Sequence, residues 1–275
     1  MSEDDQSTVN LQTRLHAAVE RREFELHVQP IVDLGLYSIH AEKPDALLRS
    51  VRGVEALLRW REGATLHTPG DFLDALESDE VMHEVNDWIA AEAFRIAREW
   101  RAEGLDLEIW INLSTRALLR TDFADRLGRT AAAAEADPKR FVIELTDASS
   151  IAEYERTAEV LEAVSQLGFR VAIDDFGVGE SSLAQQLRLP IDILKIDGTF
   201  IADVETDQPA RRIVTGIVAL GRNCGHVTVA EWVETREQCE FLIEQGCELA
   251  QGYYFLPPFE PSQVLQLLGP SSRDS

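Results

Sequence analysis

Two adjacent aspartates, Asp174 and Asp175, are the residues of this sequence whose position most suggests chemistry. They follow an apolar run and precede Gly177, a pattern typical of a buried parallel strand that opens into a loop. Because successive side chains of a strand point to opposite faces, both carboxylates can serve one site only if the strand ends there. Two neighbouring carboxylates repel each other and resist burial, so the pair suggests a divalent cation. For this pair alone, a turn with a helix-capping aspartate is the alternative.

Other strand-like runs of the chain also end in polar residues. Most of these residues carry oxygen ligands, and none is histidine or cysteine, which favours Mg²⁺ or Mn²⁺ over zinc or iron. This number of carboxylates is enough for two ions that share a bridging water, an arrangement that activates a nucleophile for phosphoester cleavage. The strand-end residues are Glu55, Asn112, Glu144, Asp174 with Asp175, Lys195 with Asp197, Glu231 and Gln251.

Two of the polar side chains, Lys195 and Arg59, have both a functional and a structural interpretation. Lys195 lies inside an apolar strand, where an ammonium costs several kcal/mol to bury unless carboxylates or a phosphate receive it. It either stabilises charge on phosphate oxygens and orients the attacking water, or forms a structural ion pair. Arg59 either clamps a substrate phosphate or forms a surface salt bridge. Gln29, like Gln251, could hydrogen-bond a base.

The elements that must position these residues alternate between strands and helices, which predicts parallel pairing and right-handed crossovers. Eight strand candidates predict an α/β fold of the (β/α)₈, or TIM, barrel type, whose active face lies where the strands end. The irregular segment between Ile31 and Ser50 resembles a hairpin with an inserted loop, which would make the first strand antiparallel and the barrel a modified one. The helices are expected over residues 11–22, 71–76, 85–100, 114–134, 152–167, 183–187, 209–220, 235–244 and 261–268, and the strands over 24–30, 53–60, 107–112, 141–147, 170–174, 191–197, 226–231 and 249–253.

Composition sets the limits of the functional interpretation. The net charge of -23 argues against nucleic acid or an anionic membrane as a partner, so a phosphate ligand would need local arginines and metal. Three cysteines without zinc-ligand spacing suggest reduced structural thiols, and no apolar run is long enough to span a bilayer. The amino terminus is acidic where a signal peptide is basic. We therefore expect a soluble cytoplasmic protein, with disorder or a linker at 1–9, one domain over 10–269 and a disordered tail at 270–275.

The ordered motifs of the chain resemble those of the EAL domain family, the cyclic-di-GMP phosphodiesterase module of bacterial signalling. Any one of the motifs alone would be weak, but together they cover about Leu11 to Leu268 in the family's order and near its spacing. They are Gln29-Pro-Ile-Val, Glu55-Ala-Leu-Leu-Arg-Trp, Asn112-Leu-Ser, Glu144-Leu-Thr, Asp174-Asp-Phe-Gly, Leu194-Lys-Ile-Asp, Glu231 with Val233-Glu-Thr, and Gln251-Gly-Tyr.

The resemblance implies a barrel that binds two Mg²⁺ or Mn²⁺ ions, is inhibited by Ca²⁺, and hydrolyses cyclic di-GMP to linear pGpG, as a homodimer under a sensor or signalling partner. It implies Lys195, Glu231 and Glu55 as catalytic residues, with Lys195 holding the nucleophilic water and Glu231 acting as general base or metal support. The implied metal ligands are Glu55, Asn112, Glu144, Asp174 and Asp175, and the implied substrate contacts are Gln29, Arg59, Asp197, Gln251 and Glu234.

Some positions depart from the family pattern. The loop after Asp175 carries Val178 where the family has a hydroxyl and Glu180 where it has an aromatic ring, and the glutamate that anchors this loop is Asp147 here. Trp232 replaces the usual glycine after Glu231, and the segment from Leu36 to Ser50 is longer than expected. These loop changes leave a second hypothesis open, a cyclic-di-GMP receptor or interaction module with weak or no turnover. Strand-end chemistry alone also allows another metal-dependent barrel enzyme, such as a lyase or aldolase.

Overall fold

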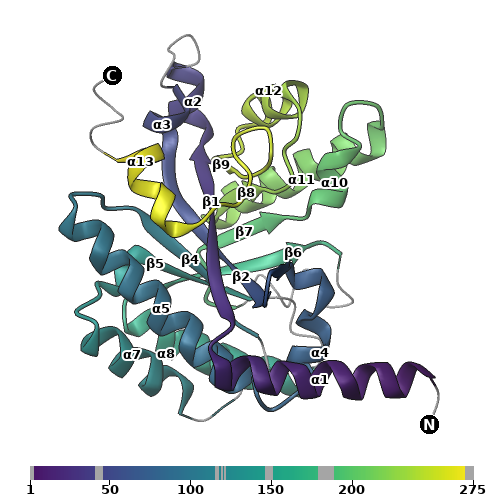
Figure 1. Cartoon of the computed structure of the whole chain (residues 1–275). Helices are drawn as coiled ribbons and strands as arrows, with labels where there is room; N and C mark the ends of the chain where they lie inside the picture. The colour runs from purple at the N-terminus through teal and green to yellow at the C-terminus, as the bar shows by residue number, and fades with distance from the viewer. Residues whose placement is uncertain are drawn as a thin grey trace.

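The computed structural model describes residues 3–40, 46–114, 118, 120, 122–145, 151–178 and 189–269 (Figure 1). A closed barrel of eight strands lies at its centre. The first strand, β1, pairs antiparallel with both β2 and β9, and the neighbouring strands from β2 round to β9 are parallel. This confirms the predicted barrel and its antiparallel first strand. The barrel strands are β1 (Phe24–Asp33), β2 (Val51–Glu62), β4 (Glu108–Asn112), β5 (Phe141–Leu145), β6 (Arg170–Phe176), β7 (Ile193–Ile196), β8 (Val227–Ala230) and β9 (Leu249–Ala250), and β3 (Thr65–His67) extends β2.

The outside of the barrel is covered by helices, among which α5, α7 and α8 lie side by side and α11 packs on β7 and β8 (Figure 1). Helix α12 follows a capping box on Thr235 and is closed by Gly246, which takes a left-handed conformation. The helices are α1 (Glu3–Arg21), α2 (Leu34–His40), α3 (Ala46–Ser50), α4 (Leu73–Glu77), α5 (Met82–Ala102), α7 (Phe123–Ala133), α8 (Ile151–Gln166), α10 (Gly198–Ala202), α11 (Gln208–Cys224), α12 (Arg236–Gln245) and α13 (Val264–Leu268), with short 3₁₀ turns η1 (Pro69–Asp71), η2 (Pro138–Arg140) and η3 (Pro261–Gln263).

Several elements differ from the sequence expectation. Helix α1 begins at Glu3, inside the segment expected to be disordered, and the insertion expected as a loop contains the helices α2 and α3. The helix expected over residues 114–134 is present as α7 in its second half, and the one at 183–187 lies outside the described residues. The first strand was expected to end at Pro30, but β1 continues to Asp33.

Pro30 is tolerated within β1 because of its position in the ladder. The amide of Val28 points away from β2 and donates to Phe259 O at 2.8 Å. Since residue 30 has the same orientation as residue 28, the proline nitrogen also faces away from β2. Its pairing with Val54 therefore loses no hydrogen bond, whereas a proline whose nitrogen faced β2 would remove one.

Two separate apolar layers hold the barrel together. One lies between the sheet and the helices, where Phe94, Phe141 and Phe169 form an aromatic cluster. The other fills the inside of the barrel, because each strand alternates between the two faces. The interior residues are Ile31, Trp110, Val142, Ala172, Ile193, Val229 and Leu249, all buried.

The interior layer also positions the polar residues. On each of six parallel strands, the residue two places beyond the apolar interior residue is polar, so it lies on the same face and nearer the strand's carboxyl end. Apolar side chains therefore fill the inside of the barrel at one level, and charged and amide side chains line it at the next level. The six pairs are Trp110 and Asn112, Val142 and Glu144, Ala172 and Asp174, Ile193 and Lys195, Val229 and Glu231, and Leu249 and Gln251.

Among the described residues, the helices include none that combines the length and the apolar character needed to cross a membrane.

Candidate active site

The ammonium group of Lys195 lies at the centre of the polar end of the barrel and is completely buried. Its Nζ is 2.6 Å from Glu144 Oε2, 2.8 Å from Glu231 Oε1, 3.1 Å from Asp174 Oδ1 and 3.7 Å from Glu55 Oε1. Burial opposes the charged amine, but Asp174, Glu144 and Glu231 outweigh it and raise the pKa of Lys195 well above its ordinary value. Lys195 is therefore a fixed positive charge and a hydrogen-bond donor, not a base.

Amide side chains hold the carboxylate of Glu55 from two sides. Asn112 Nδ2 donates to Glu55 Oε1 at 2.5 Å, and Gln251 Nε2 donates to Glu55 Oε2 at 2.7 Å. The same Gln251 nitrogen also donates to Gln29 Oε1 at 2.9 Å, and Gln29 Nε2 donates to the carbonyl of Leu256. These bonds fix the rotamers of four residues from four different strands or strand ends, so the site is built before any ligand binds.

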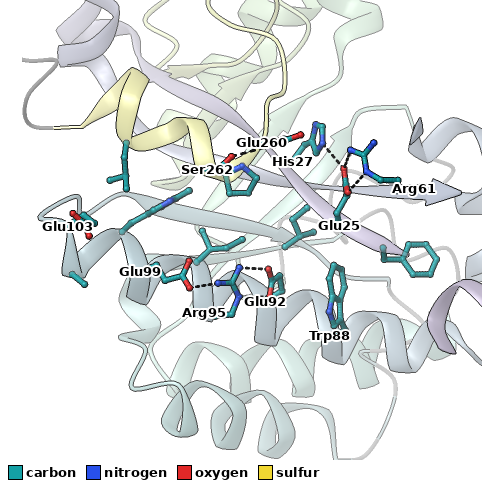
Figure 2. A pocket seen from close by; sticks show the side chains of 17 residues that line it. Glu25, His27, Arg61, Trp88, Glu92, Arg95, Glu99, Glu103, Glu260 and Ser262 are labelled. Carbon is teal, nitrogen blue, oxygen red and sulfur yellow. Dashed lines mark hydrogen bonds and ion pairs between the residues drawn. The ribbon is translucent and has the colours of Figure 1, made fainter. Parts of the chain in front are cut away.

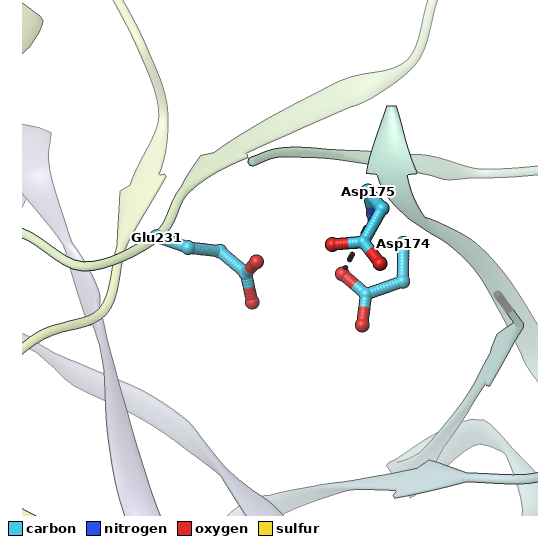
Figure 3. A group of neighbouring side chains, drawn as sticks. All are labelled: Asp174, Asp175 and Glu231. Carbon is cyan, nitrogen blue, oxygen red and sulfur yellow. Dashed lines mark hydrogen bonds between the residues drawn. The ribbon is translucent and has the colours of Figure 1, made fainter. Parts of the chain in front are cut away.

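Asp174, Asp175 and Glu231 bring one carboxylate oxygen each to within 4.8 Å of one another (Figure 3). Strand β6 was expected to end at Asp174. In the structure it continues to Phe176, with a register shift between Ile173 and Phe176. Asp175 takes a left-handed conformation, φ 51°, and its amide donates to Asp174 Oδ1 at 3.0 Å. A bulge therefore turns the second carboxylate to the site, which normal strand alternation would forbid.

Three carboxyl groups of this site, those of Glu144, Glu231 and Asp175, have raised pKa values. Burial, together with the charge of Glu55, raises the pKa of Glu144 well above its usual range, although Lys195 acts in the opposite direction. Burial raises the pKa of Glu231 to about 8. The nearby charge of Asp174 acts in the same direction, and Lys195 acts in the opposite direction. Burial and the neighbouring carboxylates of Asp174 and Asp197 raise the pKa of Asp175 to about 6. One ammonium does not compensate this many buried acids.

The donor set fits divalent cations. All its ligand atoms are carboxylate or amide oxygens, which suit Mg²⁺ and Mn²⁺. Two of these oxygens, Glu144 Oε1 and Gln251 Oε1, are buried without a hydrogen-bond partner, and a buried acceptor without a partner costs about 1–3 kcal/mol. A bound cation would satisfy such oxygens and supply the missing positive charge.

The polar end of the barrel opens into a cavity of about 560 Å³. Arg59 lines it and is nearly buried, and its Nη1 donates to the carbonyl of Leu58 at 2.8 Å. Arg59 is buried and, within the described part of the chain, forms no ion pair, which argues against its alternative interpretation as a surface salt bridge. Burial lowers the pKa of its guanidinium, although the neighbouring Tyr253 and Glu55 act in the opposite direction.

The remaining predicted residues lie around this site or outside the described chain. Glu234 lines the cavity and is exposed, whereas Asp197 caps helix α10 by accepting from the amide of Thr199 at 3.0 Å. Val178 is 55% exposed and does not line the cavity. The predicted loop residues Asp147 and Glu180 lie outside the described residues.

Sequence reasoning missed several apolar groups at the cavity. Tyr253 is 67% exposed and lines the cavity with Gln251, and Pro69 and Pro258 line it as well. Tyr253 follows a strand-end residue by two places within the Gln251-Gly-Tyr motif, so the motif could have identified it. Pro258 belongs to a loop, and nothing in its local pattern indicates where that loop runs.

A second, larger cavity of about 850 Å³ lies between β1, α5 and η3 (Figure 2). Two of its acids are paired with arginine: Arg61 Nη2 is 2.6 Å from Glu25 Oε1, and Arg95 Nη2 is 2.6 Å from Glu92 Oε1. Two further acids that line it, Glu103 and Glu260, are exposed to solvent. The Arg61 hydrogen bonds lower the pKa of Glu25, the opposite direction from the carboxylates of the barrel end. The acids of this cavity are paired with arginine or reached by water, so it lacks the buried, uncompensated carboxylates of the barrel end.

The chain is similar to known proteins in both sequence and fold. The sequence model of the EAL domain family matches residues 12–258. The bifunctional diguanylate cyclase/cyclic di-GMP phosphodiesterase MucR of Pseudomonas aeruginosa is 35% identical over 267 residues, which are 96% of this chain and 37% of that protein. The signaling protein YkoW of Bacillus subtilis is 32% identical over 261 residues, 94% of this chain and 31% of that protein.

A solved structure supports the same relationship. The PaMucR phosphodiesterase in complex with c-di-GMP aligns with a TM-score of 0.83 at 35% sequence identity, over 93% of this chain and 100% of that one. The chain spans about a third of the full length of MucR and YkoW.

Proposed function

The chain belongs to the EAL domain family, and from this premise we propose that it is a metal-dependent phosphodiesterase that hydrolyses cyclic di-GMP to linear pGpG. The observation that carries the proposal is the buried Lys195 among four carboxylates at the floor of a cavity lined by Arg59, which has no ion pair within the described residues. Metal ions bound by these carboxylates, together with the guanidinium of Arg59, would neutralise the negative charge of a phosphodiester.

The proposed cofactors are two Mg²⁺ or Mn²⁺ ions held by Glu55, Asn112, Glu144, Asp174 and Asp175. When bound, they would activate water and neutralise charge on the reacting phosphate. We expect Ca²⁺ to allow binding and to inhibit turnover.

The residues of the chain would divide the remaining work among them. Lys195 donates hydrogen bonds and keeps its charge, so it orients the attacking water and stabilises the charge that develops on phosphate oxygens. Glu231, which contacts Lys195 and faces the two aspartates, is positioned to accept the proton of that water (Figure 3). Water then adds across one phosphodiester bond of the ring, which leaves pGpG with its second phosphodiester intact.

The proposed substrate contacts line the same cavity as the carboxylates. Arg59 would pair with a phosphate, and Gln29 and Gln251 would hydrogen-bond the dinucleotide. Glu234 is an exposed acceptor on the cavity wall. Asp197 was also predicted to contact substrate, but its cap bond to Thr199 and its contact with Asp175 favour a positioning role.

The decisive experiment is incubation of the purified protein with cyclic di-GMP and Mg²⁺ or Mn²⁺, with chromatography of the nucleotides and a parallel binding titration in Ca²⁺. Metal-dependent pGpG supports the phosphodiesterase. Binding without product favours the receptor hypothesis and directs attention to the altered loop positions Asp147, Val178 and Glu180. If the protein neither binds nor cleaves cyclic di-GMP, the proposal is wrong, and small acids of the lyase or aldolase type become the next substrates to test.

Three broader predictions accompany the proposal. We expect the protein to work as a homodimer, in the cytoplasm, and under the control of a sensor or signalling partner. Sedimentation of the purified protein over a range of concentrations tests the first of these directly.

A further inference from the structure

Trp232 takes a backbone conformation and a degree of exposure that are unusual for tryptophan. It follows Glu231 directly, its φ is 52°, and it is 60% exposed, although it lines the cavity above the carboxylates. A left-handed conformation suits glycine and costs roughly 1–2 kcal/mol for other residues. A large apolar ring held in that conformation and left open to solvent contributes little to folding, so its position calls for another explanation.

One side of the indole is fixed by the backbone of Gly198. A Cβ atom placed on Gly198 would lie 2.2 Å from Trp232 Cδ2 and 2.3 Å from Cγ, so the ring rests on the glycine Cα. Gly198 is the first residue of α10, directly after its cap Asp197. A side chain at position 198 would displace the ring. The indole is therefore held by a rigid element, and most of its remaining surface is open.

The open surface of Trp232 belongs to the same cavity as the proposed phosphate site. That cavity also contains the exposed ring of Tyr253, the cation Arg59 and the acidic floor. A ligand that satisfies all of these has anionic groups for the cation and metal, and a flat π-face for the indole. A nucleotide has both, whereas a small phosphate ester or acid has no group that would cover the ring.

We propose that Trp232 is the stacking surface for one guanine base of the substrate. This inference rests on the proposed function and adds a binding residue where the family pattern has glycine. Since stacking is made in both the ground state and the transition state, Trp232 should act mainly on substrate affinity and less on the rate at saturation.

The test compares three variants by calorimetric titration of cyclic di-GMP in Ca²⁺ and by steady-state kinetics in Mg²⁺. Trp232→Gly relieves the backbone strain and removes the ring, so it should raise Kd and KM roughly 5- to 150-fold, with a much smaller change in kcat. Trp232→Phe keeps a smaller π-face and should stay within about 5-fold of the original protein. Trp88→Phe is the matched control, because Trp88 lines the second cavity and should leave Kd unchanged.

The indole also reports on its own contact. Addition of cyclic di-GMP should change tryptophan emission in the original protein and in Trp88→Phe, and this change should be lost in Trp232→Phe. If Trp232→Gly binds as tightly as the original protein or more tightly, the stacking inference is wrong while the phosphodiesterase stands. If Trp232→Gly alters sedimentation instead of affinity, the ring contacts a second copy of the chain. Absence of binding and cleavage in the original protein overturns both proposals together.

Discussion

Replacement of Lys195 by methionine tests whether the barrel end depends on its single ammonium. Methionine has nearly the same length and no charge, so it removes the cation with little change in packing. Four carboxylates would then face each other without it, three of them previously within 3.1 Å of Nζ. The variant should be less stable in the absence of metal and should lose turnover.

The size of the effect follows from burial. Removal of one partner from a buried ion pair costs about 3–5 kcal/mol, because the other partner is left as an uncompensated charge. With about 2–4 °C per kcal/mol for a domain of this size, Tm should fall by roughly 6–20 °C. Loss of a positioned donor and charge at the reacting phosphate should lower kcat by about 10²–10⁴-fold.

The assay is thermal unfolding with and without Mg²⁺, together with pGpG formation. Because the variant has lost its internal cation, added metal should raise its Tm more than that of the original protein. Glu144→Gln, which neutralises the carboxylate nearest to Nζ at 2.6 Å, should restore part of the lost stability when combined with Lys195→Met. Lys195→Arg keeps the charge and serves as the control for charge against shape.

The reasoning is refuted if Lys195→Met unfolds at the same temperature as the original protein and responds equally to metal. That outcome would mean that the carboxylates are protonated or solvated without the help of Lys195. A fall in stability that Glu144→Gln does not relieve would indicate lost packing and not lost charge.

Two further predictions follow from single side chains. Glu55→Ala should abolish pGpG formation, because it removes a proposed metal ligand and leaves the amides of Asn112 and Gln251 without their acceptor; full turnover would exclude Glu55 as a ligand. Gly252→Ala should lower the free energy of unfolding in urea by about 1–3 kcal/mol or more, since its Cβ would lie 2.1 Å from Val233 O at a φ of 157°, and unchanged stability would contradict that close approach.

Strand periodicity is what made the barrel and most of its site predictable from the sequence. Six of the parallel strands carry an apolar interior residue and a polar one two places later, as with Val142 and Glu144 or Ile193 and Lys195. This spacing of two is a local property, so it can be read from one segment at a time. The convergence of the polar ends then follows from barrel closure, which the alternation of strands and helices predicts.

The features that the sequence did not reveal depend on local backbone departures or on distant partners. The bulge at Asp175 requires a left-handed aspartate, and no side-chain pattern distinguishes it from a strand that simply ends. The tolerance of Pro30 depends on its register against Val54 of β2, which turns the proline nitrogen away from that strand. The place of Trp232 depends in the same way on contact with Gly198. Propensity describes single segments, so it is silent on all three.

The two cavities of this barrel show why buried, uncompensated charge locates the site better than size does. The larger one contains Glu25 with Arg61 and Glu92 with Arg95, and its remaining acids Glu99, Glu103 and Glu260 are exposed. Its electrostatics would gain little from any ligand, since its charges are paired or solvated by water. The smaller one sets one buried lysine against more acids than it can neutralise, and its arginine has no acid partner among the described residues. Binding of cations and a phosphate would lower the cost of these buried charges, which is the physical condition for a site that selects them.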